Sequence, residues 1–195
     1  KDKAVGVRLR DGREWKAKLA VVSNTDPYAT FRELIDQEHL PRAFSERIEA
    51  IEADEFSYFQ IHLALKAPVR YALHEADDPA VARAMNVNIG PEKPEDLNEM
   101  WKEIRAGEFP QHVCIHAICP TLFDPLQAPS GKHAASLFMP VPYQLKGKKP
   151  EDWVKLKDGF MNDLLCIWRR YATNLTDDNI EMKVAMDPFY IAGRW

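Results

Sequence analysis

The fold is decided by the stretch Phe56-Ser57-Tyr58-Phe59-Gln60-Ile61-His62-Leu63-Ala64-Leu65. Its side chains alternate between two kinds with a period of two, as in a β-strand, whose successive side chains point to opposite faces. One set is mainly apolar and suited to pack against helices, and the other is mostly polar or aromatic. The apolar set is Ser57, Phe59, Ile61, Leu63 and Leu65, and the opposite set is Tyr58, Gln60, His62 and Ala64.

Patterns on the C-terminal side of this strand predict further strands at 85–89, 113–118, 134–141 and 180–186. Apolar residues at steps of three or four predict helices over 94–104 and from about Glu151 to Tyr171. The alternation in 134–141 sets Leu137 and Met139 against Ser136 and Phe138, without indicating which pair faces the core. Together these elements predict an α+β fold, with a mixed β-sheet covered by helices on one face.

On the N-terminal side the sequence predicts a β-hairpin, a strand and two helices. Alternating apolar residues flank the turn dipeptide Asp11-Gly12, and the run Ala20-Val21-Val22 is typical of a buried parallel strand. One helix is expected to start near Pro27, with Phe31, Leu34 and Ile35 on its apolar face, and a second to start at Pro41.

Composition excludes some classes of function. The net charge of −4 is spread along the chain, and no Lys/Arg block forms a phosphate-tracking stripe, so nucleic acid is not an expected partner. No apolar run approaches the roughly 20 residues of a membrane span. The sequence therefore gives no sign of membrane association, although attachment to a membrane by other means stays open. The three cysteines form no CxxC motif and fit free thiols in a reducing compartment, so we expect a cytoplasmic protein.

His112, Cys114 and His116 lie at alternate positions of a predicted strand and are chemically suited to bind zinc. Adjacent same-face strand positions are too far apart for three ligands to share one ion easily, and no fourth ligand is evident. No motif around Cys114 supplies the base that a nucleophilic thiol needs. We therefore expect no metal site here, and assign no catalytic residue.

Two separate stretches resemble one family of flavoproteins. The first is Ala4-Val5-Gly6-Val7-Arg8-Leu9 through Ala20-Val21-Val22-Ser23-Asn24-Thr25-Asp26-Pro27. The second is Pro120-Thr121-Leu122-Phe123-Asp124-Pro125, followed by Ala128-Pro129-Ser130-Gly131-Lys132-His133 and Pro140-Val141-Pro142-Tyr143. Both resemble the phytoene dehydrogenase-like (carotenoid-desaturase-like) branch of the amine-oxidase-type FAD-dependent oxidoreductases, in family order from about residue 4 to 172.

The resemblance implies that the chain is an internal fragment, with residues 1–26 a remnant of the FAD-binding domain and 27–195 the substrate-binding domain. FAD would bind the intact protein, but no cofactor is expected in this fragment, because it lacks the GxGxxG turn that holds the pyrophosphate. Ser23 and Asn24 would lie nearest the dinucleotide. Tyr58, Gln60 and His62 would face an apolar small-molecule substrate, oxidised by hydride transfer to the flavin. The exposed N-terminal strands would be free to pair in a dimer.

Two alternatives stay open at this point. The face carrying Tyr58, Gln60 and His62 could equally be the solvent-facing side of a half-buried sheet. The chain could also be a non-enzymatic α+β module that binds an apolar ligand or a protein partner.

Overall fold

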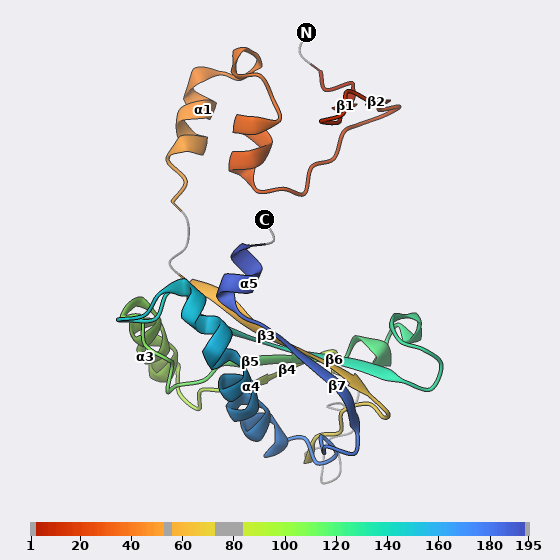
Figure 1. Cartoon of the computed structure of the whole chain (residues 1–195), viewed down its shortest axis with the longest axis vertical. Helices are drawn as coiled ribbons and strands as arrows, with labels where there is room; N and C mark the ends of the chain where they lie inside the picture. Colours follow the sequence, from red (N-terminus) through yellow and green to blue (C-terminus); the bar gives the residue numbers. More distant parts are fainter. Residues whose placement is uncertain (1–2, 53–55, 73–83, 194–195) are drawn as a thin grey trace. The chain divides into compact units, whose positions relative to one another are not determined.

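The computed structural model describes residues 3–52, 56–72 and 84–193. The chain folds as two compact units, residues 1–53 and 54–195 (Figure 1). The sequence predicts a boundary after residue 26, between a remnant of an FAD-binding domain and a substrate-binding domain of a larger protein. That assignment stays a prediction.

The first unit opens with the predicted hairpin, of which residues 1 and 2 lie outside the described residues. Strands β1 (Gly6–Arg8) and β2 (Glu14–Lys16) pair antiparallel. Gly12 adopts a φ of 88° in the turn, a left-handed conformation that glycine enters at little cost. The Asp11 carboxylate accepts a hydrogen bond from the Arg13 backbone N–H, which also helps to close the turn.

The predicted strand over Ala20–Val22 is wrong, because the structure has no strand at these positions. Val22 is 89% exposed, where a buried strand was expected. A parallel strand needs hydrogen-bonded neighbours, and the described residues of this unit offer none beyond the two strands of the hairpin. The apolar run is therefore left in an extended, unpaired segment.

Short helical elements complete the first unit. The helix expected near Pro27 is a brief π-helical turn, η1 (Ala29–Glu33), in which Leu34 lies 67% exposed instead of on an apolar face. A 3₁₀ turn, η2 (Gln37–His39), leads to α1 (Arg42–Glu49), which starts after Pro41 as predicted. The rings of Phe31 and Phe44 meet edge to face at 4.9 Å and join η1 to α1.

The second unit is built on a five-stranded sheet with the order β4-β5-β6-β3-β7. The α+β fold class is confirmed. Every pairing in this sheet is antiparallel, so the sheet is not mixed as expected. A parallel pair requires a crossover connection between neighbouring strands. The crossover from β6 to β7 places β7 beside β3 instead, and β7 runs antiparallel to β3. The strands are β3 (Phe56–Leu65), β4 (Asn86–Ile89), β5 (Ile115–Ile118), β6 (His133–Pro142) and β7 (Ile180–Met186).

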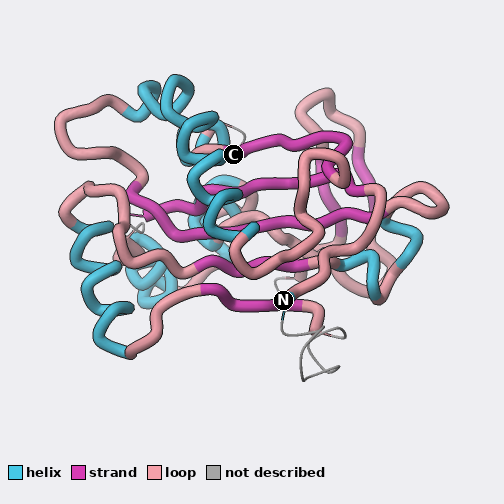
Figure 2. Tube along the Cα trace, turned by 90° about the horizontal axis from the view of Figure 1, so that it is seen from below, coloured by secondary structure: helices cyan, strands magenta, loops and turns pink. Residues whose placement is uncertain are grey.

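Helix α4 (Trp153–Arg169) covers one face of the sheet, as Figure 1 shows, and Figure 2 shows it lying across the strands from that side. Phe59 is fully buried there, and its ring meets those of Trp153 and Phe160 at 5.9 and 4.8 Å. Two further helices are α3 (Pro94–Arg105) and α5 (Pro188–Ala192). Short 3₁₀ turns lie at Pro120–Leu122, Pro125–Gln127 and Pro150–Asp152.

None of the helices in the described ranges has both the length and the apolar character needed to cross a membrane.

Candidate substrate-binding face

The alternation in β3 separates a buried face from an open one, as the sequence predicts. Phe59, Ile61 and Leu65 are fully buried beneath α4 and its neighbours. Tyr58, on the opposite face, is 44% exposed, and Gln60 and His62 are half-buried beside it. The register is fixed because a slip of one residue would expose the whole apolar set. Tyr58, Gln60 and His62 therefore lie together on the face away from α4.

Strand β6 joins this open face and settles which of its side chains belong there. Directly paired residues of neighbouring strands share a face, and His62 pairs with Ser136 while Gln60 pairs with Phe138. Leu137 is fully buried on the core side. The sequence left the orientation of 134–141 undecided, and the structure places Ser136 and Phe138 on the open face.

His62 is held in place by side chains of this face. Its Nδ1 lies 2.8 Å from the Ser136 hydroxyl, and its Nε2 lies 3.3 Å from Oε1 of Gln60. Since a carbonyl oxygen can only accept, this geometry assigns the proton to Nε2 and lets Nδ1 accept from Ser136. Burial lowers the pKa of His62 below its ordinary value. The imidazole is thus neutral near pH 7, with both nitrogens engaged.

The other three strands extend the open face in register with β3 and β6. Among the described residues that strand pairing places on this face, none is Asp, Glu, Lys or Arg, although 29% of the chain is charged. Glu181 lies at the irregularity of β7, where pairing assigns it to neither face, and forms an ion pair with Lys132. A solvent-facing sheet is expected to carry charges of both signs. The further members of the face are Asn86 and Asn88 of β4, His116 and Ile118 of β5, Ala134 and Pro140 of β6, and Met182, Val184 and Met186 of β7.

Aromatic side chains bound one end of the open face. The Phe56 ring meets Trp101 of α3 at 5.0 Å and Tyr58 at 5.9 Å, both edge to face. Pro140 and Pro142, which pair with Tyr58 and Phe56, are buried at the same end. The face therefore has a closed aromatic end and an open remainder.

Ser23 and Asn24 lie in the first unit, in the extended segment before η1. The Ser23 hydroxyl is within 3.1 Å of the Thr25 hydroxyl and 2.9 Å of the Thr30 hydroxyl. The helical turn that follows is closed by Asp26, whose carboxylate accepts from the Ala29 backbone N–H at 2.9 Å. A second negative charge, such as a pyrophosphate, is disfavoured at this turn. The contact of Ser23 and Asn24 with a dinucleotide stays a prediction.

The candidate zinc ligands do not come together. His112 lies before β5, with its Nδ1 3.2 Å from Oε1 of Glu103, and His116 lies on the open face. Burial raises the pKa of the Cys114 thiol, which disfavours the thiolate that binds metal. In the described part of the chain, no group of three His, Cys, Asp or Glu residues is placed to hold a metal ion.

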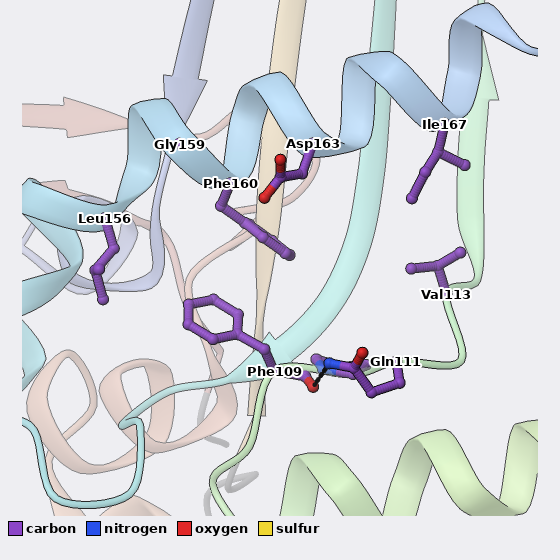
Figure 3. A pocket seen from close by; sticks show the side chains of 9 residues that line it. Phe109, Gln111, Val113, Leu156, Gly159, Phe160, Asp163 and Ile167 are labelled. Carbon is purple, nitrogen blue, oxygen red and sulfur yellow. Dashed lines mark hydrogen bonds between the residues drawn. The ribbon is translucent and has the colours of Figure 1, made fainter.

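A separate groove of about 460 Å³ lies between α4 and the segment that leads into β5. Figure 3 shows Phe160 of α4 pointing toward Phe109, with the Asp163 carboxylate beside the gap. The amide of Gln111 turns back to donate to the Phe109 carbonyl at 3.2 Å. The groove is on the α4 side of the sheet and offers few polar groups. The α4 residues lining it are Leu156, Gly159, Phe160, Asp163 and Ile167.

No known family model matches this chain. Curated proteins do match it. Pyridine nucleotide-disulfide oxidoreductase domain-containing protein 2 of Mus musculus is 32% identical over 151 residues, covering 75% of this chain and 26% of the mouse protein. A limonene dehydrogenase subunit of Castellaniella defragrans is 27% identical over 88% of this chain and 32% of its own length. The chloroplastic prolycopene isomerase of Arabidopsis thaliana is 32% identical over 70% of this chain and 19% of its own length.

These relatives support the superfamily of FAD oxidoreductases and carotenoid-desaturase-like proteins. The chain is a distant homologue of them and spans 19–32% of their length. The resemblance seen in the two motif stretches is thus supported at the level of the superfamily.

Sequence reasoning missed several members of the open face. Asn86 and Asn88 belong to a short strand whose apolar residues gave the only signal, and Met182 and Val184 belong to a strand in which Glu181 and Lys183 alternate with them. The alternation in 180–186 could have marked an apolar face. It could not have indicated that this face continues the one on β3.

Proposed function

We propose that the intact protein is a phytoene dehydrogenase-like, FAD-dependent oxidoreductase, and that the open face of this sheet is the floor of its substrate site. The observation that carries the proposal is the absence of charged side chains from the open-face positions of the five described strands. Burying an unpaired charge against an apolar molecule is costly, so a floor that must be dry is built from neutral groups. The names of two relatives, an oxidoreductase domain-containing protein and a dehydrogenase subunit, also support a redox function.

The flavin, when bound, would supply the acceptor for a hydride from the substrate. This chain's own residues would orient the substrate and exclude water. Neutral His62, held by hydrogen bonds to Ser136 and Gln60, adds no charge to the surface that the substrate would contact. Tyr58 and Phe138 offer flat aromatic surface to an apolar molecule. Ser23 and Asn24 would contribute a neutral contact to the dinucleotide.

The test places a negative charge on the floor of the full-length protein. Val184→Asp is expected to slow anaerobic bleaching of the flavin absorbance by apolar terpenoid hydrocarbons by at least about tenfold, because the carboxylate must lose its water when substrate covers it. Val154→Asp is the matched control, since Val154 of α4 is 51% exposed and Val184 is 45% exposed. The control is expected to leave bleaching unchanged.

Equal rates for Val184→Asp and the unaltered protein would contradict the substrate floor. A full-length protein that purifies without flavin absorbance would instead favour the non-enzymatic α+β module. Pairing of two copies through the N-terminal strands and a cytoplasmic location stay predictions, which sedimentation equilibrium and cell fractionation would test.

A further inference from the structure

The open face changes character from one edge of the sheet to the other. At the β7 edge, Met182, Val184 and Met186 present only apolar side chains, and Met182 is 65% exposed. At the β4 edge, Asn86 and Asn88 present amide groups. Strands β5, β6 and β3 lie between these two edges. The polarity of the open face therefore rises from the β7 edge to the β4 edge.

The capacity for hydrogen bonding is also unevenly distributed. In the middle of the face, His62 makes hydrogen bonds to both Ser136 and Gln60. Toward the β4 edge, the side chains of Asn88 and His116 lie opposite each other in register. Neither makes a side-chain hydrogen bond within the described residues. Among the described residues of this face, donors and acceptors open to a ligand are therefore found on β4 and β5 and, beside the aromatic end, at the Tyr58 hydroxyl.

We infer that the substrate is amphipathic and uncharged, with an apolar body over β7 and β3 and one neutral hydrogen-bonding group, such as a hydroxyl or carbonyl, over Asn88 and His116. This inference rests on the proposed function. No Lys or Arg lies on the described strands of this face to pair with a carboxylate or phosphate. Adjacent strands lie about 4.8 Å apart, so the distance from β7 to β4 is roughly 19 Å and suits an extended molecule.

The experiment compares three probes that share a skeleton: farnesene, farnesol and farnesoate, delivered from cyclodextrin to the full-length holoenzyme and measured by calorimetry. Farnesol is expected to bind about tenfold more tightly than farnesene, because one to two hydrogen bonds form at its polar end. Farnesoate is expected to bind more weakly than farnesol, because its carboxylate would be desolvated without a cationic partner.

The double variant Asn88→Leu with His116→Leu is expected to erase the preference for farnesol while farnesene binding is kept. Asn98→Leu, at an exposed position of α3, is the matched control and should keep the preference. Equal affinity for farnesene and farnesol, or tightest binding of farnesoate, would overturn the inference while leaving the proposed function standing. Binding of none of the three, together with normal flavin bleaching by Val184→Asp, would overturn both.

Discussion

At the scale of single residues, adjacent positions of one strand have different roles. Ile61 is fully buried beneath α4, whereas its neighbours Gln60 and His62 face the open side. Only the buried set contributes directly to the hydrophobic core. A substitution at a core-facing position should therefore affect stability, and one at an open-face position should affect ligand contact.

Ile61→Ala is expected to lower the free energy of unfolding by about 2–5 kcal/mol, because it removes buried methylene groups and leaves a cavity. Tyr58→Ala, on the open face, should cost much less stability but change turnover of the full-length protein. Urea denaturation followed by circular dichroism checks the first result, and flavin bleaching checks the second. Similar losses of stability in the two variants would contradict the division of the strand.

His62 gives the open face a dependence on pH. Because burial lowers its pKa in the folded protein, the unfolded chain binds a proton more readily as the pH falls through the ordinary value of 6.5. The contribution of His62 to stability is therefore present above that pH and is lost below it.

We expect His62→Gln to flatten this part of the stability curve. Free energies of unfolding measured at about pH 7.5 and about pH 5.5 should differ less in the variant than in the unaltered protein. The His62 side-chain pKa, followed by NMR, should lie below 6.5. A value above 6.5 would show that the neutral form is not the one held by Ser136 and Gln60.

At the scale of elements, one buried asparagine joins the end of β3 to the start of β7. Asn179 accepts a hydrogen bond from the Ala67 backbone N–H at 2.8 Å and donates to the Ala67 and Asn174 carbonyls at 3.1 and 3.0 Å. Its side chain replaces the backbone pairing that is lost where both strands end. The open-face residues of β7 depend on this junction for their register against β3.

Asn179→Ala is expected to destabilise the protein by about 1–3 kcal/mol, because it leaves backbone groups of the half-buried Ala67 and Asn174 without these partners. Asp178→Ala, at the exposed neighbouring position, is the control and should have little effect. Chemical denaturation of both variants makes the comparison. Hydrogen exchange should show faster opening of β7 in Asn179→Ala, and unchanged exchange there would argue against a role at the junction.

At the scale of the whole molecule, the two units differ in what they are equipped to do. The second unit has an extensive core and an uncharged face. The first unit ends its hairpin in an unpaired apolar segment and starts its first helical turn at Asp26. Within the described residues, no glycine-rich turn leads into a helix where a dinucleotide phosphate could be held.

These 195 residues, expressed alone, are therefore expected to purify without flavin. The measurement is the visible absorbance of the purified chain, with the full-length protein as the positive control. Titration with FAD should produce no saturable quenching of flavin fluorescence. Stoichiometric yellow flavin on the shorter chain would refute this expectation, and with it the assignment of the main cofactor contacts to other segments.

The sequence by itself determined the strand over Phe56–Leu65, the division of that strand into two faces and the long helix that covers one of them. These features are local, since the period of side-chain alternation is a property of consecutive residues. Only the tertiary structure decided that Ser136 faces His62, that Met182 and Asn88 share their face, and that Ala20–Val22 forms no strand. Register and sheet order depend on pairing between residues far apart in the chain, and an apolar run becomes a strand only where a neighbour satisfies its backbone hydrogen bonds.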